Sequence, residues 1–544
     1  MTRPGVPFWL DLNAQVPLRD GTVLAATVYR PTELDIRVPA LVCLTPYGRD
    51  RLHSTAKFFA QNGLAFAAVD CRGRGDSSGR FLPHIHDGKD GYDTVEWFAS
   101  QNWCSGETAM YGSSYSGYAQ WATASERPCS LKTFVATSAA FPTVDVPDRG
   151  SIPYAFNLQW AALFASRSIP IQLFADTAYW ESVYSDLRER RLPFASHEEV
   201  VGCCIEPFEA WNSSHAAALS QQPCPYELRY DCIGIPTLSI TGLWDSNQLG
   251  ALEHYRRQTQ ARRGDVPDCL IVGPWDHAGC QDTPSSLGAI DFGATAKVDL
   301  MSIMLYWYLW HFGMGRRPSW LTKNVAMFDA TAKDWRFLES FRNVHLEEFA
   351  TYGARASLRL VEPLSSQDCT STVLRSTAAE EAAVGFNFLD IPSYLTAFPV
   401  HGTQHALMFD TEPVSERCLI AGFVSLEFSY MWLDDQREAS SDVEFYLYAI
   451  DPSGANLLLG RTHRRLHTGG DICESSGGQR CELSDLGVCC ATLERGAQFR
   501  LWIREMNSIF VQKNRFDIST NSVVILHGSS STEWGLRLKV PLQR

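Results

Sequence analysis

A serine at a sharp turn is the first feature of this chain that could do chemistry. Residues 109–118 run from an apolar strand through a Gly-Ser-Ser turn into a helix. Such a turn lifts the hydroxyl of Ser114 out of the backbone as a nucleophile, and it needs small residues beside it. Gly112 and Gly117 supply these. The common pattern has its second glycine two residues after the serine, where Ser116 stands, so a helix N-cap serine is the alternative.

A serine nucleophile needs a histidine base, and the base needs a carboxylate to hold its tautomer. Asp245 and His277 each follow an apolar strand, and they come after Ser114 in the order Ser, Asp, His that α/β-hydrolases show. The carboxyl ends of parallel strands share one edge of a sheet. We therefore predict Ser114, Asp245 and His277 as a catalytic triad. Asp276 is a rival acid, but a partner from a separate strand suits the geometry better than a sequence neighbour.

The elements that must position these residues follow an α/β pattern in the first third of the chain. Apolar runs at 40–44 and 64–69 are typical of strands buried on both faces of a parallel sheet. Residues 93–100 have helical spacing, and residues 131–136 form another expected strand. This alternation predicts an α/β fold.

The pattern changes twice further along. Residues 146–231 are helical and rich in aromatic residues, so we expect a cap inserted over the ligand-binding edge of the sheet, with the aromatic side chains either facing that edge or forming the cap's own core. After about residue 340, alternating apolar residues predict a β-sandwich or jelly roll. The Gly/Ser-rich segment 469–487 is expected to be a loop. The expected divisions are core 1–145, cap 146–231, core 232–339 and jelly roll 340–544.

Composition narrows the class of protein. The 544 residues are 45% hydrophobic and 20% charged, as in folded proteins, and the net charge of −14 argues against nucleic acid and anionic membranes as partners. We expect a cytoplasmic protein, because the first residues lack the apolar segment of a signal peptide and the run 301–312 is too short to span a bilayer. The 16 cysteines form no repeated Cys-x-x-Cys pair, so we expect no zinc site and mostly reduced, buried thiols.

Four blocks of sequence carry a resemblance to a known family. They are Thr45-Pro46-Tyr47-Gly48, the Asp-Cys-Arg-Gly-Arg-Gly-Asp-Ser-Ser-Gly run at 70–79, the helix start Asp93-Thr94-Val95-Glu96-Trp97 with the turn 112–117, and Gly273-Pro274-Trp275-Asp276-His277. With these blocks the chain resembles the cocaine esterase and X-Pro dipeptidyl-peptidase group of α/β-hydrolases, which includes the α-amino acid ester hydrolases. The family's Gly-x-Ser-Tyr-x-Gly turn accounts for the later position of Gly117. The resemblance implies an α/β-hydrolase core with an inserted helical cap and a C-terminal jelly roll.

The resemblance also implies roles for individual residues. Ser114 would be the nucleophile, His277 the base and Asp245 the acid that orients it. The hydroxyl of Tyr47 and the backbone N–H of Tyr115 would form the oxyanion hole, in which two preplaced donors stabilise the charge of a tetrahedral intermediate. Simple packing is the alternative for Tyr47.

Residues close to the triad in sequence are candidates for the substrate pocket. Trp121, Trp244 and Trp275 either line an acyl pocket or pack in the core. Ser246 and Asn247 stand where close relatives have glycine and an aromatic residue, so a polar wall is expected there. That departure puts a preference for aromatic esters in doubt and leaves the triad intact.

The expected function is that of a serine hydrolase acting on a small ester, amide or short peptide through an acyl-enzyme, without a metal or an organic cofactor. An X-Pro dipeptidyl-peptidase would need a carboxylate for the substrate's amine, and Glu181, Asp186 and Glu189 of the cap are candidates. An acyltransferase, or a biosynthetic cyclisation or release enzyme, would use the same triad. A non-catalytic binding module is a further alternative, and a homo-oligomer is left open.

Overall fold

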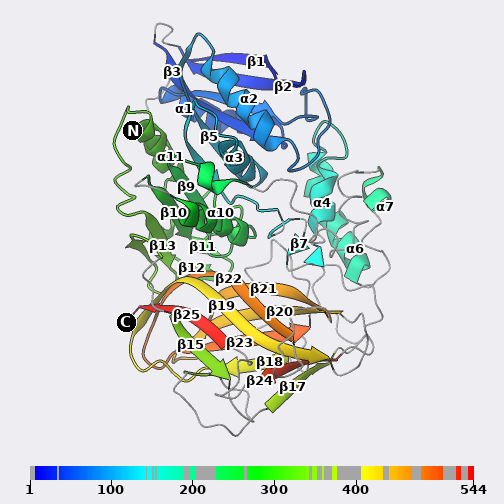
Figure 1. The fold of residues 1–544 in the computed structure, drawn as a ribbon, viewed down its shortest axis with the longest axis vertical. Helices are drawn as coiled ribbons and strands as arrows, with labels where there is room; N and C mark the ends of the chain where they lie inside the picture. Colours follow the sequence, from blue (N-terminus) through cyan, green and yellow to red (C-terminus); the bar gives the residue numbers. More distant parts are fainter. Residues whose placement is uncertain are drawn as a thin grey trace.

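A computed structural model shows an α/β part, a group of cap helices and a β-rich C-terminal part (Figure 1). It describes residues 7–32, 36–142, 144–146, 148–149, 152–153, 156–188, 197–203, 205, 228–262, 266–341, 346–351, 358–360, 370–375, 406–432, 440–467, 479–505, 522–527 and 537–543.

The α/β part is built on one ten-stranded sheet in the order β1-β2-β4-β3-β5-β6-β9-β10-β13-β14. The strands are β1 (Phe8–Pro17), β2 (Val23–Pro31), β3 (Val38–Thr45), β4 (Ala65–Asp70), β5 (Cys104–Ser113), β6 (Leu131–Thr137), β9 (Thr237–Gly242), β10 (Asp268–Gly273), β13 (Val325–Asp329) and β14 (Asp334–Leu338). The seven strands from β4 to β13 in this order pair in parallel, and the strands at both ends pair antiparallel. Every residue of β4, β9 and β10 is buried, as expected for strands covered on both faces.

Helices cover both faces of this sheet. They are α1 (His53–Gln61), α2 (Asp87–Ala99), α3 (Tyr115–Ser125), α10 (Gln248–Ala261) and α11 (Leu300–His311). Successive residues of β3 alternate between the two faces, so Val42 packs in a core with α2 and α3, while Cys43 packs with α1 and α11. The predicted α/β-hydrolase fold is confirmed.

Helix α2 begins six residues earlier than the helical spacing at 93–100 predicts. Its first turns contain Gly88 and Gly91, so this part of the helix lacks the regularly spaced apolar side chains by which a helix is recognised in a sequence. A Cβ on Gly91 would lie 1.8 Å from the hydroxyl of Thr123 on α3, so glycine there permits close packing of the two helices.

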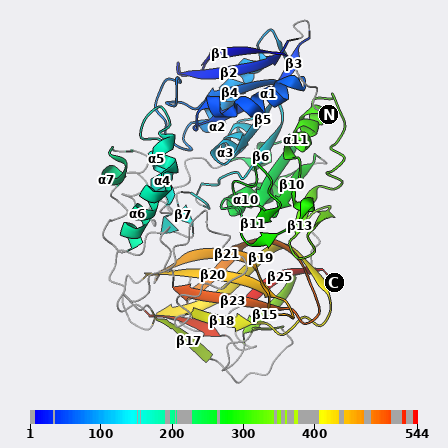
Figure 2. The same ribbon diagram turned by 180° about the vertical axis from the view of Figure 1, so that it is seen from behind.

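The cap follows β6 and stands at one side of the sheet, next to α3 and above β20 and β21 (Figures 1 and 2). It contains β7 (Asp148–Arg149), β8 (Ile152–Pro153), α4 (Phe156–Ala162), α5 (Ile171–Ala175), α6 (Thr177–Arg188) and α7 (His197–Val201). Trp180 is 2% exposed and packs within the cap, whereas Trp160 and Phe174 line a cavity over the sheet. Both expected uses of the cap's aromatic residues therefore occur.

Shorter elements connect the core strands. They are the 3₁₀ turns η1 (Arg49–Leu52), η2 (Tyr230–Cys232) and η3 (Ala294–Ala296) and the small hairpin β11 (Ser286–Leu287) and β12 (Ile290–Asp291). None of the helices in the described ranges combines the length and apolar composition needed to cross a bilayer.

The C-terminal part consists of two antiparallel sheets. One has the order β16-β15-β25-β19-β24-β17, with β22 also paired to β19, and the other has the order β18-β23-β20-β21. The strands are β15 (Leu346–Thr351), β16 (Leu358–Leu360), β17 (Thr370–Arg375), β18 (Ala406–Asp410), β19 (Cys418–Trp432), β20 (Ser440–Ile450), β21 (Asn456–His467), β22 (Gln479–Leu493), β23 (Gln498–Glu505), β24 (Ser522–His527) and β25 (Arg537–Gln543). Alternate residues of β19 and β23, such as Leu426 and Leu501, are fully buried in one core between the sheets.

The prediction of a loop at 469–487 is wrong for its second half. Strand β22 begins at Gln479 and pairs with β19, while residues 468–478 lie outside the described ranges. Long-range pairing with β19 overrides the polar local composition. Gly487, with φ 116°, stands at the register shift between Val424 and Leu426.

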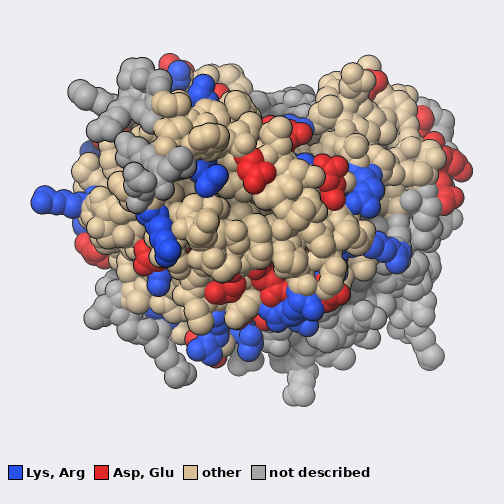
Figure 3. Space-filling model, turned by 90° about the horizontal axis from the view of Figure 1, so that it is seen from above, with Lys and Arg blue, Asp and Glu red and all other residues tan. Residues whose placement is uncertain are grey.

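The C-terminal part packs directly on the core. The backbone N–H of Val488 donates to the side chain of Gln248 at the start of α10 (3.1 Å), and Thr492 bonds Asp329 at the end of β13. On the face in Figure 3, acidic and basic side chains are interspersed on a largely uncharged surface. The net negative charge is therefore not gathered into one acidic patch on that face.

Candidate active site

Ser114 is the single residue that connects β5 to α3, and its backbone conformation is strained. Its φ of 60° and ψ of −120° are unusual for a residue with a side chain. A Cβ on Gly112 would lie 2.5 Å from the Cβ of Ser116, and one on Gly117 would lie 2.9 Å from the Cα of Ala139. Both glycines are therefore required by close backbone approach at the turn.

His277 and Asp245 meet at the carboxyl ends of neighbouring strands. The Nδ1 of His277 lies 2.8 Å from the Oδ1 of Asp245. The carboxylate also accepts hydrogen bonds from the backbone N–H of Asn247 (2.9 Å, to Oδ1) and from the hydroxyl of Thr241 (2.8 Å, to Oδ2). A carboxylate can only accept, so Nδ1 carries the proton and Nε2 is left as the basic nitrogen.

The electrostatics of the pair match this assignment. Burial opposes ionisation of Asp245, but the facing His277 and the hydrogen bonds together lower the pKa of its carboxyl. Burial likewise opposes the charged form of His277, yet Asp245 raises the pKa of the imidazole above its ordinary value. The side chain of Asp245 is fully buried and that of His277 is 23% exposed, so the histidine is the member that faces the cavity.

Tyr47 faces Ser114 from the loop after β3. Burial raises the pKa of the Tyr47 hydroxyl, while hydrogen bonds involving the Trp160 indole, the Ser114 side chain and the Tyr115 backbone N–H act to lower it. Tyr47, Ser114 and Tyr115 line the same cavity. A phenolic hydroxyl and a backbone N–H beside a serine are the kinds of donor that can stabilise an oxyanion.

These groups open into one cavity of about 630 Å³ between the core and the cap. Ser114, His277, Tyr47 and Tyr115 line it. From the cap, the lining includes Phe156, Trp160, Leu163, Ile169 and Phe174. The cavity therefore places a mainly apolar cap wall, with Asn157, Gln159 and Thr177 as its polar members, opposite the polar groups at the strand ends.

Part of the chain that contains these site residues matches the model of a known protein family. Residues 20–279 match the model of the X-Pro dipeptidyl-peptidase (S15) family. The matched range contains all four of the sequence blocks described above, and it ends two residues after His277.

The relatives of the S15 segment include an esterase. Cocaine esterase of Rhodococcus sp. (strain MB1 Bresler) is 33% identical over 291 residues, which are 49% of this chain and 48% of that protein. The chain thus aligns with about half the length of this curated relative.

Solved structures share the fold over the whole chain. An α-amino acid ester hydrolase superposes with a TM-score of 0.76 at 17% identity, covering 100% of this chain and 98% of that one. An aminopeptidase from a marine sediment archaeon, Thaumarchaeota archaeon, superposes with a TM-score of 0.75 at 16% identity, with the same coverage. The three-part architecture is therefore that of a known fold.

The three tryptophans near the triad in sequence are packed in cores and do not line the cavity. Trp121 stacks on His254 (centroids 5.1 Å apart), and the Trp275 indole donates to the carbonyl of Ala296. Trp244 is buried against the C-terminal part, where its indole donates to the carbonyl of Leu458. The structure thus favours packing, the alternative to a pocket role.

Asn247 is the one predicted pocket residue that does line the cavity, together with Ser246. Its side chain donates to the carbonyl of Ser138 (3.2 Å), so the amide is held in place. The wall after Asp245 is polar, and the aromatic surface comes from the cap instead.

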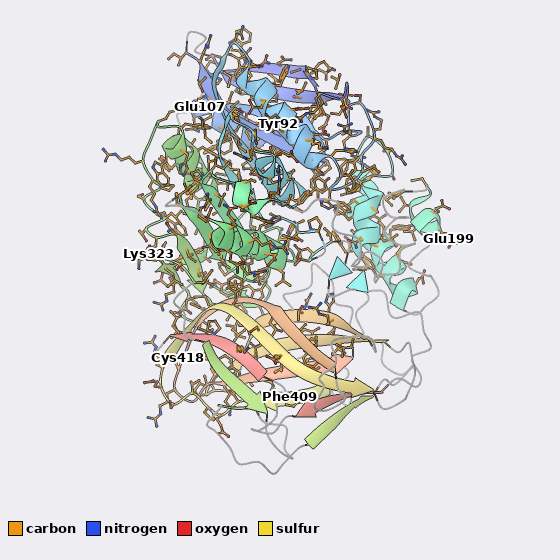
Figure 4. The ribbon with its side chains drawn as sticks, viewed as in Figure 1. Tyr92, Glu107, Glu199, Lys323, Phe409 and Cys418 are labelled. Atoms are coloured by element: carbon orange, nitrogen blue, oxygen red, sulfur yellow. The ribbon has the colours of Figure 1, made fainter. Side chains whose placement is uncertain are left out.

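Of the cap carboxylates proposed for amine binding, the two that the structure describes, Glu181 and Asp186, do not line the cavity. Glu181 is exposed and Asp186 is not among the lining residues, while Glu189 lies outside the described ranges. Glu199, on α7, stands at the outer edge of the cap (Figure 4). Among the described lining residues the only carboxylate is Asp145, which accepts the backbone N–H groups of Phe141 and Gly250.

Two residues that touch the site, His84 and Thr241, were not predicted from the sequence. His84 lines the cavity, and its ring stacks on Tyr115 with centroids 4.7 Å apart. Burial lowers the pKa of His84 to about 3, so the ring is neutral. Thr241 holds the carboxylate of Asp245. The only available signal was position, since His84 follows the 70–79 block and Thr241 is the penultimate residue of the strand before Asp245.

Proposed function

We propose that this protein is a serine hydrolase that cleaves an ester through an acyl-enzyme intermediate. The observation that carries the proposal is a single cavity lined by Ser114, His277 and two oxyanion donors, with His277 bonded to buried Asp245. The match of residues 20–279 to the S15 family model and the similarity to an esterase support it.

In the first half-reaction, the Ser114 hydroxyl attacks the substrate's carbonyl carbon while Nε2 of His277 takes its proton. Asp245 stabilises the imidazolium that forms. The tetrahedral oxyanion lies between the hydroxyl of Tyr47 and the N–H of Tyr115. The intermediate collapses as His277 gives its proton to the leaving alcohol.

In the second half-reaction, water replaces the alcohol. His277 removes a proton from the water as the water attacks the acyl carbonyl, and the same oxyanion donors stabilise the second tetrahedral intermediate. Collapse returns the proton to Ser114 and releases the acid. Every proton transfer uses groups of this chain.

An uncharged ester fits the cavity better than an X-Pro dipeptide. A peptide's free ammonium group requires a carboxylate partner. Among the described lining residues that partner would have to be Asp145, which is only 2% exposed and bonds the backbone N–H groups of Phe141 and Gly250. The cap wall presents aromatic and aliphatic side chains that suit apolar acyl or alcohol groups. We therefore propose small apolar esters as the substrate class.

A fluorophosphonate probe and a series of p-nitrophenyl esters test the proposal. Ser114→Ala abolishes both labelling and turnover. Ser113→Ala is the matched control, because Ser113 precedes the nucleophile in the same turn, and it retains labelling. Labelling of folded Ser114→Ala protein, or faster cleavage of X-Pro amides than of esters, would contradict the proposal. Product analysis with an added alcohol or amine separates hydrolysis from acyl transfer.

A further inference from the structure

The cap supplies a hydrogen-bond donor to the hydroxyl of Tyr47. The Nε1 of Trp160, on α4, lies 3.2 Å from the phenolic oxygen. An indole nitrogen donates and cannot accept. The oxygen of Tyr47 is therefore the acceptor in this bond, and the hydroxyl's own proton must point elsewhere.

The other neighbours of that hydroxyl are the groups assigned to the reaction. Ser114 and Tyr115 line the same cavity as Tyr47, and both are hydrogen-bonding neighbours that affect the pKa of its hydroxyl. Because the Trp160 N–H occupies one acceptor position of the oxygen, the O–H bond of Tyr47 is free to point towards the serine, where the oxyanion would form. Hydrogen bonds in a chain also polarise one another, so a hydroxyl that accepts a bond is a stronger donor.

We propose that Trp160 is a positioning residue for the oxyanion hole. Its N–H sets the rotation of the Tyr47 O–H and strengthens that hydroxyl as a donor, so the cap completes a site whose other members come from the core. This inference rests on the proposed function, because it requires an oxyanion to be stabilised.

Trp160 is held firmly enough for this role. Its ring stacks on Tyr115 (centroids 6.3 Å apart, planes at 26°) and meets the edge of Phe164 (4.4 Å, 72°). Tyr115 contributes the second oxyanion donor through its backbone. One aromatic side chain of the cap therefore contacts both residues that would hold the oxyanion.

A buried guanidinium links the two partners of the bond. Arg74, which is 2% exposed, donates to the carbonyl of Pro46 (3.2 Å), next to Tyr47. It also donates to the carbonyls of Leu163 (2.7 Å) and Ser166 (2.5 Å), which directly follow α4. The loop of Tyr47 and the cap segment after Trp160 are thus tied to the same group.

A double-mutant cycle tests the inference. Trp160→Phe keeps the aromatic ring and removes the N–H, and we expect kcat for a p-nitrophenyl ester to fall about fivefold. Tyr47→Phe lowers kcat about 100-fold. In the Tyr47→Phe background, Trp160→Phe has no further effect, because the N–H acts only through the missing hydroxyl. Equal reductions by Trp160→Phe in both backgrounds, or none in the wild type, would overturn the inference.

Trp180→Phe is the matched control. Trp180, on α6, donates its indole N–H to the carbonyl of Leu173 (2.7 Å) and has no bond to Tyr47, so the same loss of a donor in the same cap leaves kcat unchanged. Titration with a fluorophosphonate normalises kcat to competent sites and corrects for any misfolded fraction. A wild-type protein without labelling or turnover would contradict the proposed function, whereas turnover with multiplicative effects would contradict only the role of Trp160.

Discussion

His277 Nδ1 and Asp245 Oδ1 lie 2.8 Å apart although 32 positions separate the two residues in sequence. Their strands, β9 and β10, are parallel neighbours in register from Thr237 and Asp268 onward. The sheet therefore brings the two loops that carry this pair together, and the contribution of the pair to chemistry can be tested by changing either residue.

Asp245→Asn lowers kcat about 10,000-fold, because an amide at this position no longer holds the imidazole in the tautomer that leaves Nε2 basic.

The Asp245→Asn variant also shifts the pH profile of kcat/KM. His277 must be neutral to accept a proton, and Asp245 raises its pKa, so kcat/KM of the wild type rises with pH around a midpoint above the ordinary histidine value. Without the carboxylate that midpoint moves to lower pH. A midpoint that stays in place would contradict the electrostatic role of Asp245.

Thr241→Val removes the hydroxyl that donates to Asp245 Oδ2 while keeping the shape of the side chain. We expect about 2 kcal/mol of lost stability and an approximately fivefold lower kcat, since a bond to a buried carboxylate is lost. Thr237→Val is the control, because Thr237 donates to the carboxylate of Asp268 (2.7 Å) at the opposite end of the same strand. It lowers the free energy of unfolding similarly and leaves kcat intact. Urea unfolding and ester kinetics measure the two effects.

Gly112→Ala disturbs the turn that presents Ser114. The added Cβ would lie 2.5 Å from the Cβ of Ser116, so we expect about 1–3 kcal/mol of lost stability and a marked loss of fluorophosphonate labelling. Gly234→Ala meets nothing within 4 Å and has no positive φ, and it serves as the control. Normal labelling of Gly112→Ala would show that the turn tolerates a wider approach.

Arg74→Met leaves three carbonyls without their donor, and each unpaired buried group costs about 1–3 kcal/mol. The cap segment is expected to become sensitive to limited proteolysis near Leu163. Arg256→Met removes an exposed pair with Glu253 on α10 and costs less than about 1 kcal/mol. Equal protease resistance of the two variants would argue against Arg74 as the link between cap and core.

Asp87 predicts a pH dependence of stability. Burial raises the pKa of its carboxyl to about 7, although the bond from the Tyr115 hydroxyl acts to lower it. Between about pH 4 and pH 7 the unfolded chain loses this proton and the folded protein keeps it, so the contribution of Asp87 to stability falls as pH rises and then levels off.

Asp87→Asn removes that cost. The variant should equal the wild type at pH 4 and exceed it at pH 8 by an amount on the order of a few kcal/mol in thermal or urea unfolding. Asp20, whose pKa is lowered by its hydrogen bond to Arg72, has the opposite sign, so Asp20→Asn is destabilising at pH 8 and neutral at low pH. A constant difference for Asp87→Asn across this range would contradict the raised pKa.

The fold class and the resemblance to the S15 family could be predicted because their signals are local. Apolar runs on the scale of one strand and a glycine-flanked serine depend on backbone geometry within a few residues. The loop expected at 469–487 failed for the opposite reason, since β22 exists through pairing with β19. The amino-acid composition around Gln479 does not indicate that this segment pairs with β19.

The substrate side of the site could not be predicted in the same way. Trp121 and Trp275 are near the triad along the chain, but their rings point into cores, because adjacent residues of strands and helices face different directions. Trp160, far from Ser114 in sequence, reaches Tyr47 because the cap folds back over the sheet edge.

The sequence by itself determined the α/β core, the family resemblance and the candidate reacting groups, since these depend on residue types at short spacings. Only the tertiary structure decided which side chains surround those groups: the cap wall, the carbonyls bound by Arg74 and the indole that donates to Tyr47. The physical reason is that burial and hydrogen-bond direction arise where segments distant in sequence pack together. A linear pattern does not encode those distances.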